Sequence, residues 1–98
     1  MNHMKLPQKG FYYHCKHDPK LDINNYAYEV VGVARHSEDR TYLVVYRPLY
    51  KSDFSAHIDF CVRPLDMFME DVVIKGIKQP RFKKIDDVDI INKLSGLI

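Results

Sequence analysis

Two short stretches of the chain hold residue types that can do chemistry. The first runs from His14 to Asp18 and contains two histidines and a cysteine within five residues. Such side chains bind zinc, but a zinc signature needs a second ligand pair, which only His57 and Cys61 could supply. The alternative is a strand end that enters a polar loop, with Cys15 as a small apolar filler. We favour this alternative and expect neither a metal nor another cofactor.

The second stretch, His36-Ser37-Glu38, contains three residue types found in hydrolases. Neighbouring residues of a strand point to opposite faces, so these three cannot form a catalytic triad among themselves. The alternative is turn chemistry, with Ser37 bonded to the hairpin backbone and His36 half-buried at a strand end. A small hydrolase-type enzyme that uses His36, Glu38 and Arg63 is therefore our last hypothesis, behind two kinds of binding module.

Arg63 is the candidate ligand for an anion. It precedes Pro64 and shares a predicted strand face with Asp59 and Cys61. A guanidinium held on a strand can bind a carboxylate or a phosphate through two parallel hydrogen bonds. The alternative is an internal ion pair with Glu70 or Asp59, because buried arginines are usually paired.

Tyrosine is the most abundant aromatic residue: the chain has seven Tyr and five Phe but no Trp. Tyr42, Tyr46 and Tyr50 share one strand face, and Tyr26 and Tyr28 could extend this stripe across a hairpin. Rings interleaved with basic residues are typical of stacking platforms for single-stranded nucleic acid. Aromatic-lined grooves also bind proline-rich peptides. The third interpretation is that the stripe is core, since tyrosine suits strands and is often buried.

The elements that position these residues are mostly strands. Residues 26–36 alternate most clearly, and a tight polar turn joins them to a second strand at 41–50 in a hairpin. Shorter strands are expected at 11–15, at 58–63 and as a last pair, 72–74 with 81–82. The other expected elements are a helical turn at 65–70 and a terminal helix after Asp86. The side chains of Phe60, Phe68 and Phe82 are expected to fill the core.

The predicted fold class is mainly β, a small, strongly bent barrel or roll of five to six short antiparallel strands with a terminal helix. Ninety-eight residues allow one domain. We divide the chain into a lead-in (1–9), a barrel (10–85) and a C-terminal helix (86–98). The net charge of +2 is too small to indicate a polyanion partner by itself. Neither an export signal nor a membrane span is evident, and two distant cysteines suit the cytoplasm.

Several runs, in this order, resemble the small bacterial family called domain of unknown function 1653. These runs are Gly10 to Lys16, Tyr28 to Val30, Ala34 to Glu38, Val44 to Tyr50, Val62 to Glu70 and Pro80 to Phe82. The resemblance implies an SH3-like barrel and brings no established activity. This chain differs from the family in having Cys61 where the family often carries an aromatic ring before Val-Arg-Pro. It also has a longer segment between residues 16 and 25.

The sequence thus predicts a small cytosolic binding module whose aromatic and basic groove takes nucleic acid or another anionic ligand. A protein- or peptide-binding module is the alternative, and no membrane is expected as a partner. The apolar second face of residues 41–50 suggests either a homodimer or packing of the terminal helix. The groove is predicted to contain Tyr13, His14, His36, Glu38, Tyr46, Tyr50 and Arg63.

Overall fold

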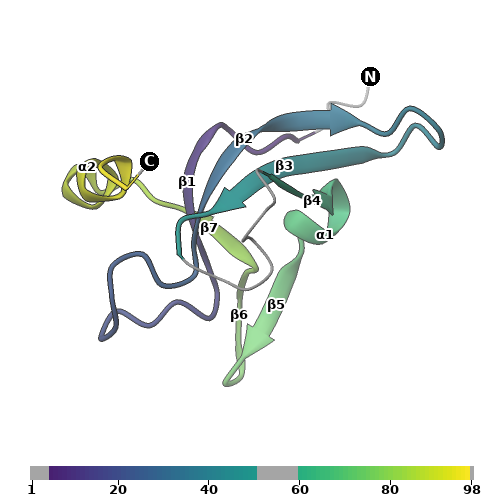
Figure 1. Ribbon diagram of the computed structural model, residues 1–98. Coiled ribbons are helices and arrows are strands. Elements are labelled where there is room, and N and C mark those ends of the chain that lie inside the picture. The colour runs from purple at the N-terminus through teal and green to yellow at the C-terminus, as the bar shows by residue number, and fades with distance from the viewer. Residues whose placement is uncertain (1–4, 51–59, 98) are drawn as a thin grey trace.

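The computed structural model describes residues 5–50 and 60–97. These residues form seven strands and two helices: β1 (Gly10–His14), β2 (Ala27–Arg35), β3 (Tyr42–Pro48), β4 (Cys61–Pro64), α1 (Leu65–Phe68), β5 (Asp71–Ile74), β6 (Ile77–Pro80), β7 (Phe82–Lys84) and α2 (Val88–Ser95) (Figure 1). The mainly β fold class is therefore confirmed.

Five strands make one antiparallel sheet in the order β4-β3-β2-β1-β7, and β5 and β6 make a separate hairpin. Within the described ranges β4 and β7 are the two edges, so these ladders do not close into a barrel. The long β2–β3 hairpin projects from one side of the molecule and α2 lies at the opposite side, while β5 and β6 project below the sheet (Figure 1).

A β-bulge in β2 reverses the face on which its side chains point. Val30 lies opposite Tyr46, but Gly32 lies opposite the next residue, Val45, so Val31 is the additional residue. Each bulge residue shifts the alternation by one position. Strict alternation over residues 26–36 predicts that Gly32 and Ala34 share the face of Val30. This prediction is wrong beyond Val30, because Val33 lies opposite the buried Val44.

The last strands pair differently from the prediction. Residues 72–74 pair with residues 77–79 in the β5–β6 hairpin, whose turn is formed by Lys75 and Gly76. Both turn residues have positive φ, 52° and 77°, as the tightest two-residue hairpin turns require. Phe82 belongs instead to β7, where it lies opposite His14 of β1. The partner of β7 is thus a strand from the other end of the chain.

Two clusters of buried side chains form the core. The larger one lies between the sheet and α1 and contains five aromatic rings and three aliphatic side chains: Tyr12, Tyr28, Val30, Val44, Tyr46, Leu65, Phe68 and Phe82. The smaller one lies between the sheet and α2 and contains Phe11, Ala27, Ile85 and Leu94, with Leu49 packed against it. In this smaller cluster Leu49, an apolar residue of segment 41–50, packs together with the terminal helix α2.

The tyrosine stripe is divided between core and surface. Tyr46 is only 7% exposed, whereas Tyr42 at the hairpin end is 40% exposed. The ring of Tyr46 meets the rings of Tyr28, Phe68 and Phe82 at centroid distances of 5.4, 6.3 and 6.1 Å. Tyr46 is therefore a core residue, as one of the three interpretations held.

Strand β4 turns its more polar face inward. Phe60 and Val62 are 46% and 56% exposed, whereas Cys61 and Arg63 are half-buried. Our expectation that Phe60 fills the core is wrong. The predicted alternation of side chains along β4 is correct. Alternation alone does not show which face of a strand is buried when both faces carry apolar side chains.

Helix α2 is capped by Asp87, not by Asp86, because the Asp87 carboxylate accepts the backbone N–H groups of Asp89 and Ile90.

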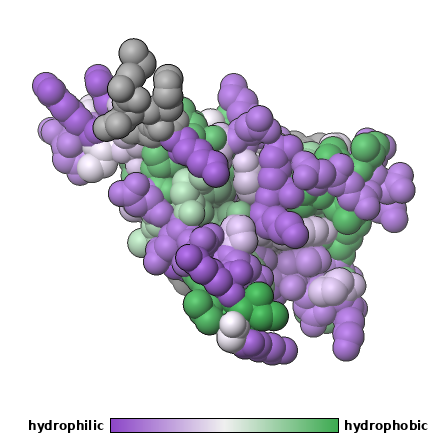
Figure 2. Space-filling model, turned by 180° about the vertical axis from the view of Figure 1, so that it is seen from behind, coloured by the Kyte–Doolittle hydropathy of each residue, from purple (hydrophilic) through white to green (hydrophobic). Residues whose placement is uncertain are grey.

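Seen from behind, the molecule is mostly hydrophilic, with hydrophobic side chains gathered on the α2 side and at the β5–β6 hairpin (Figure 2). In the described ranges, neither helix has the length and apolar character needed to cross a membrane.

The burial of Tyr46 predicts how the core responds to truncation. Tyr46→Ala should lower the free energy of unfolding by about 3–5 kcal/mol, because it removes a ring packed against three others. The matched variant Tyr42→Ala, on the same strand face, should change it by less than about 1 kcal/mol. Urea unfolding followed by circular dichroism measures both. A Tyr46→Ala variant that is as stable as Tyr42→Ala would show that the ring is not part of the core.

Candidate functional site

Four aromatic side chains gather where β1 ends and β7 begins. His14 lies opposite Phe82 in the ladder, with its ring centroid 5.1 Å from that of Phe82. On its other side the His14 ring lies 5.7 Å from Tyr26, and Tyr26 lies 5.8 Å from Tyr50. We call these four residues the aromatic shelf. Four separate segments supply it, one residue each, which brings residues 14, 26, 50 and 82 to one place.

Two hydrogen bonds, one of the backbone and one between side chains, hold Tyr26 and Tyr50 in the outer part of the aromatic shelf. The Tyr26 carbonyl accepts the His14 N–H at 2.9 Å, and Tyr26 has a φ of 51°. This left-handed conformation is uncommon outside glycine and is costly without support. The Tyr50 hydroxyl is hydrogen-bonded to the Tyr28 hydroxyl at 2.5 Å. Burial raises the pKa of Tyr28 further above its usual value, so this phenol remains neutral.

Arg63 covers the inner part of the aromatic shelf. Its guanidinium carbon lies 5.1 Å from the centroid of the Phe82 ring, a cation–π arrangement. Its Nη1 donates to the Met67 sulfur at 3.6 Å. The Arg63 Nε is buried and has no hydrogen-bond partner among the described residues. The internal ion pair that we considered is not formed with Glu70, and Asp59 lies outside the described residues.

A second arginine, Arg81, lies at the bend between β6 and β7. Its Nη2 is 3.4 Å from the Glu70 carboxylate, and its Nε is likewise buried without a partner in the described part of the chain. The Arg81 backbone is held at both ends: its N–H donates to the Glu70 carbonyl and its carbonyl accepts the Cys15 N–H. Arg81 thus connects the end of β1 to the start of β5.

The surroundings of His14 lower the pKa of its imidazole. This pKa falls to about 4, first because burial disfavours the charged imidazolium and then because Arg63, Lys16 and Arg81 carry positive charge nearby. His14 is therefore neutral at pH 7. Its Nδ1 accepts the Lys16 N–H at 3.1 Å, which places the proton on Nε2, 3.9 Å from the Cys15 sulfur. The aromatic shelf together with Arg63, Arg81 and Lys16 is called the basic–aromatic site below.

The basic–aromatic site contains three of the residues predicted from the sequence: His14, Tyr50 and Arg63. Tyr46 lies in the core beneath it. Tyr13 points to the other face of β1, where its ring stacks on His17 and its hydroxyl donates to the Ile23 carbonyl.

His36 and Glu38 are not part of the basic–aromatic site. Both are exposed in the turn of the β2–β3 hairpin, where the His36 Nδ1 accepts the N–H groups of Glu38 and Asp39 at 3.1 and 3.4 Å. The length of β3, seven residues or about 20 Å, lies between this turn and Tyr50. Arg63 lies opposite Val44 in the β3–β4 ladder, and among the described residues neither His36 nor Glu38 makes a hydrogen bond or ion pair with it. The structure therefore does not show the hydrolase-type set that we considered.

The site residues outside our predicted groove are Lys16, Tyr26, Arg81 and Phe82. Tyr26 was predicted only as a possible extension of the tyrosine stripe, and Arg81 and Phe82 only as a short strand and part of a family motif, with Phe82 as core. The signal that could have found them is the pairing of β7 with β1, which sequence alternation does not reveal. Cys61 packs beside Tyr50 against the larger core cluster, so the position where resembling sequences carry a ring borders this site.

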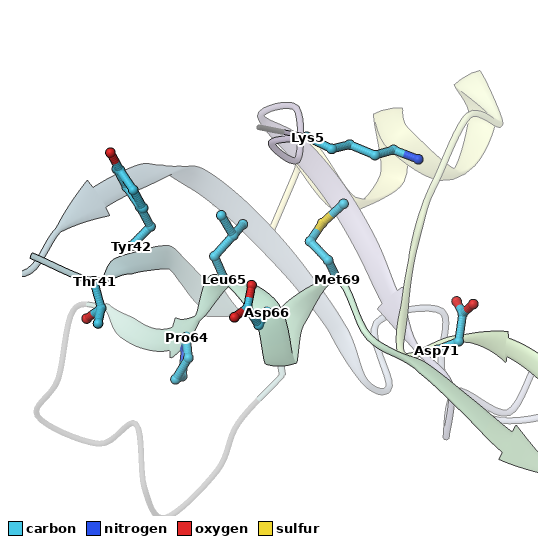
Figure 3. Close-up of a pocket in the computed structure, with 8 residues that line it drawn as sticks. All are labelled: Lys5, Thr41, Tyr42, Pro64, Leu65, Asp66, Met69 and Asp71. Atoms are coloured by element: carbon cyan, nitrogen blue, oxygen red, sulfur yellow. The ribbon is translucent and has the colours of Figure 1, made fainter. Parts of the chain in front are cut away.

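A concave region lies beside α1 (Figure 3). We call it the α1 groove, and it has a cavity volume of about 630 Å³. None of the predicted site residues lines it. Its lining residues are Lys5, Thr41, Tyr42, Pro64, Leu65, Asp66, Met69 and Asp71.

Metal chemistry finds little support in the described residues. Within these ranges, no three His, Cys, Asp or Glu side chains are placed so that they could hold a metal ion together. Cys15 and Cys61 are free thiols. His57, which we considered as a completing ligand, lies outside the described residues.

Comparison with known proteins identifies the family. The model of the family described as "Protein of unknown function (DUF1653)" matches residues 10–84. The fold is similar to the crystal structure of a DUF1653 protein from Bordetella bronchiseptica, with a TM-score of 0.65 and 31% sequence identity. This similarity covers 83% of the present chain and 90% of that one. A search of curated proteins found no match. The chain therefore belongs to the DUF1653 family.

Proposed function

We propose that the protein is a binding module for single-stranded nucleic acid, which it takes at the basic–aromatic site. One observation carries the proposal: the Nε groups of Arg63 and Arg81 are buried without an acceptor among the described residues. Buried polar groups nearly always have a hydrogen-bond partner. A phosphate supplies oxygens that match guanidinium donors in charge and geometry, and the aromatic shelf next to them suits a base.

The roles of the individual residues follow from their positions. Arg63 and Arg81 would hold one phosphate from two sides. Tyr26, which is 38% exposed, presents the most accessible ring for stacking with a base. The neutral His14 offers its Nε2–H as a donor without adding a charge that would have to be desolvated.

The site is short, which limits what it can bind. Because Tyr46 is buried, the tyrosine stripe is not a continuous platform, and the shelf has room for about one or two bases. The small net charge of +2 supplies little general attraction to a polyanion. We therefore propose recognition of one or two nucleotides, with few phosphates contacted and modest affinity.

Removing either arginine head group should weaken nucleic-acid binding. Arg63→Gln and Arg81→Gln should each lower the affinity for a fluorescein-labelled deoxythymidine octamer roughly tenfold, because each loses charged hydrogen bonds to phosphate. Each should also reduce the salt slope of binding by about 1. Fluorescence anisotropy at low salt measures both quantities.

Arg35→Gln is the matched control, since it removes the same charge from the exposed end of β2. An equal loss of affinity in this control would show that binding depends on general charge. Absence of binding by the unmodified protein at low salt would rule out the proposal. Binding of inorganic phosphate without binding of the octamer would reduce the site to a simple anion site.

The depressed pKa of His14 predicts how stability depends on pH. The pKa of His14 is about 4 in the folded protein and 6.5 in the unfolded chain, so only the unfolded chain takes up the proton as pH falls through this window. The contribution of His14 to folding is therefore present above pH 6.5 and is lost as pH falls from 6.5 toward 4. Urea midpoints at about pH 7 and about pH 4.5 should differ less in His14→Gln than in the unmodified protein. Identical pH dependence in both would contradict the neutral, buried state of His14.

Ligand binding should also change the titration of His14. A phosphate between Arg63 and Arg81 would offset two of the positive charges that lower the His14 pKa, so that pKa should rise when the octamer binds. NMR titration of the imidazole C–H resonances, with and without the octamer, measures the shift. An unchanged or lower His14 pKa in the saturated complex would place the ligand elsewhere.

A further inference from the structure

The α1 groove has an apolar floor and lies apart from the basic–aromatic site. Leu65 belongs to the larger core cluster and forms the floor, with Met69 beyond the end of α1 and Tyr42 of β3 exposed beside it. The cavity volume of about 630 Å³ falls within the range of small-ligand pockets. The groove can therefore accept a whole side chain with its neighbouring backbone.

The rim of the α1 groove is acidic. Asp66 lies in the first turn of α1 and Asp71 is the first residue of β5, so the two carboxylates approach the groove from consecutive elements (Figure 3). Among the described residues, no basic side chain lies within ion-pair distance of Asp66. The Asp71 Oδ2 lies 4.0 Å from the Lys78 Nζ, and both of these side chains are at least half exposed. Neither carboxylate is thus strongly engaged within the described chain.

One cation of the chain itself also lines the α1 groove. The Lys5 side chain extends over Met69 (Figure 3). In the described ranges its ammonium has no carboxylate within ion-pair distance. The lining therefore carries two negative charges and one positive charge, and Lys5 opposes the entry of any other cation.

We propose that the α1 groove is a docking site for a basic segment of a partner protein, which inserts a lysine or arginine flanked by apolar residues. Lysine and arginine bury their aliphatic stems on apolar surface and keep the charged head at the rim. Here the stem lies on Met69 and Leu65, and the head reaches Asp66 and Asp71. The exposed Tyr42 ring adds a face that attracts a cation. The same charges reject nucleic acid, so the two sites select partners of opposite sign.

The proposal predicts that removing a carboxylate and removing the Lys5 ammonium have opposite effects on peptide binding. The probe is a blocked pentapeptide with a central lysine flanked by leucines, titrated at low salt into protein with ¹³C-labelled methionine methyl groups. The Met69 methyl resonance should shift. Asp66→Asn and Asp71→Asn should each weaken binding roughly two- to fivefold, the usual range for an exposed charge pair. Lys5→Gln should strengthen binding by a similar factor, because it removes the repelling charge.

Matched controls separate this site from general effects. Asp22→Asn removes a carboxylate from an exposed loop and should leave peptide affinity unchanged. Peptides with norleucine or glutamate in place of the central lysine should bind more weakly, in that order, because norleucine keeps the stem without the charge. Arg63→Gln should bind the lysine peptide normally, which makes the test independent of nucleic-acid binding.

Three results would overturn the proposal. The first is no Met69 shift at millimolar lysine peptide. The second is equal affinity for the lysine, norleucine and glutamate peptides, which would show that Asp66 and Asp71 do not select charge. The third is a Lys5→Gln variant that binds the lysine peptide no more tightly than the unmodified protein.

Discussion

The ring of Phe82 is the contact on which the rest of the structure depends. On one side it stacks on Phe68 at 4.3 Å with nearly parallel planes, which holds α1 against the sheet. Its edges meet Tyr28 and His14, and the guanidinium of Arg63 lies over its face. A single side chain thus belongs to the core and to the basic–aromatic site at once. The position of Arg63 follows from packing that the core requires in any case. That packing lowers the pKa of His14, first through burial and then through the charge of Arg63.

Local features of this fold could be predicted from the sequence, and long-range ones could not. The β2–β3 hairpin and the short helix after Pro64 follow from alternation and from proline, which act over a few residues. The bulge at Val31 could not be located, because one inserted residue leaves the composition of the strand unchanged. The small residues Gly32 and Ala34 indicated a bend but not the reversal of faces. The pairing of β7 with β1 joins segments about 70 residues apart and leaves no periodic signal in either.

The same distinction between local and long-range features applies to the residues of the candidate site. Arg63 and His14 were found because their residue types have chemical meaning by themselves. Tyr46 was placed in the groove because period-two spacing shows that rings share a face, but not whether that face is covered. The structure covers it with α1 and Phe82. What is left exposed is a small site whose cations come from three separate segments, so a net charge of only +2 hides a local concentration of positive charge. The carboxylates of the α1 groove balance that charge elsewhere on the same small domain.

The pairing of β1 with β7 also decides when during synthesis the protein acquires its basic–aromatic site. Strands β1 to β3 can form as soon as they leave the ribosome, because their ladders connect neighbouring segments. Until residue 82 follows, His14 packs only against Tyr26, the Arg63 guanidinium lacks the Phe82 ring beneath it, and the larger core cluster lacks its centre. Closing that long loop costs conformational entropy. Contacts that form together and late in folding have to offset this cost. A nascent or truncated chain that ends before β7 therefore lacks the site altogether, and recognition of a ligand at that site requires the nearly complete domain.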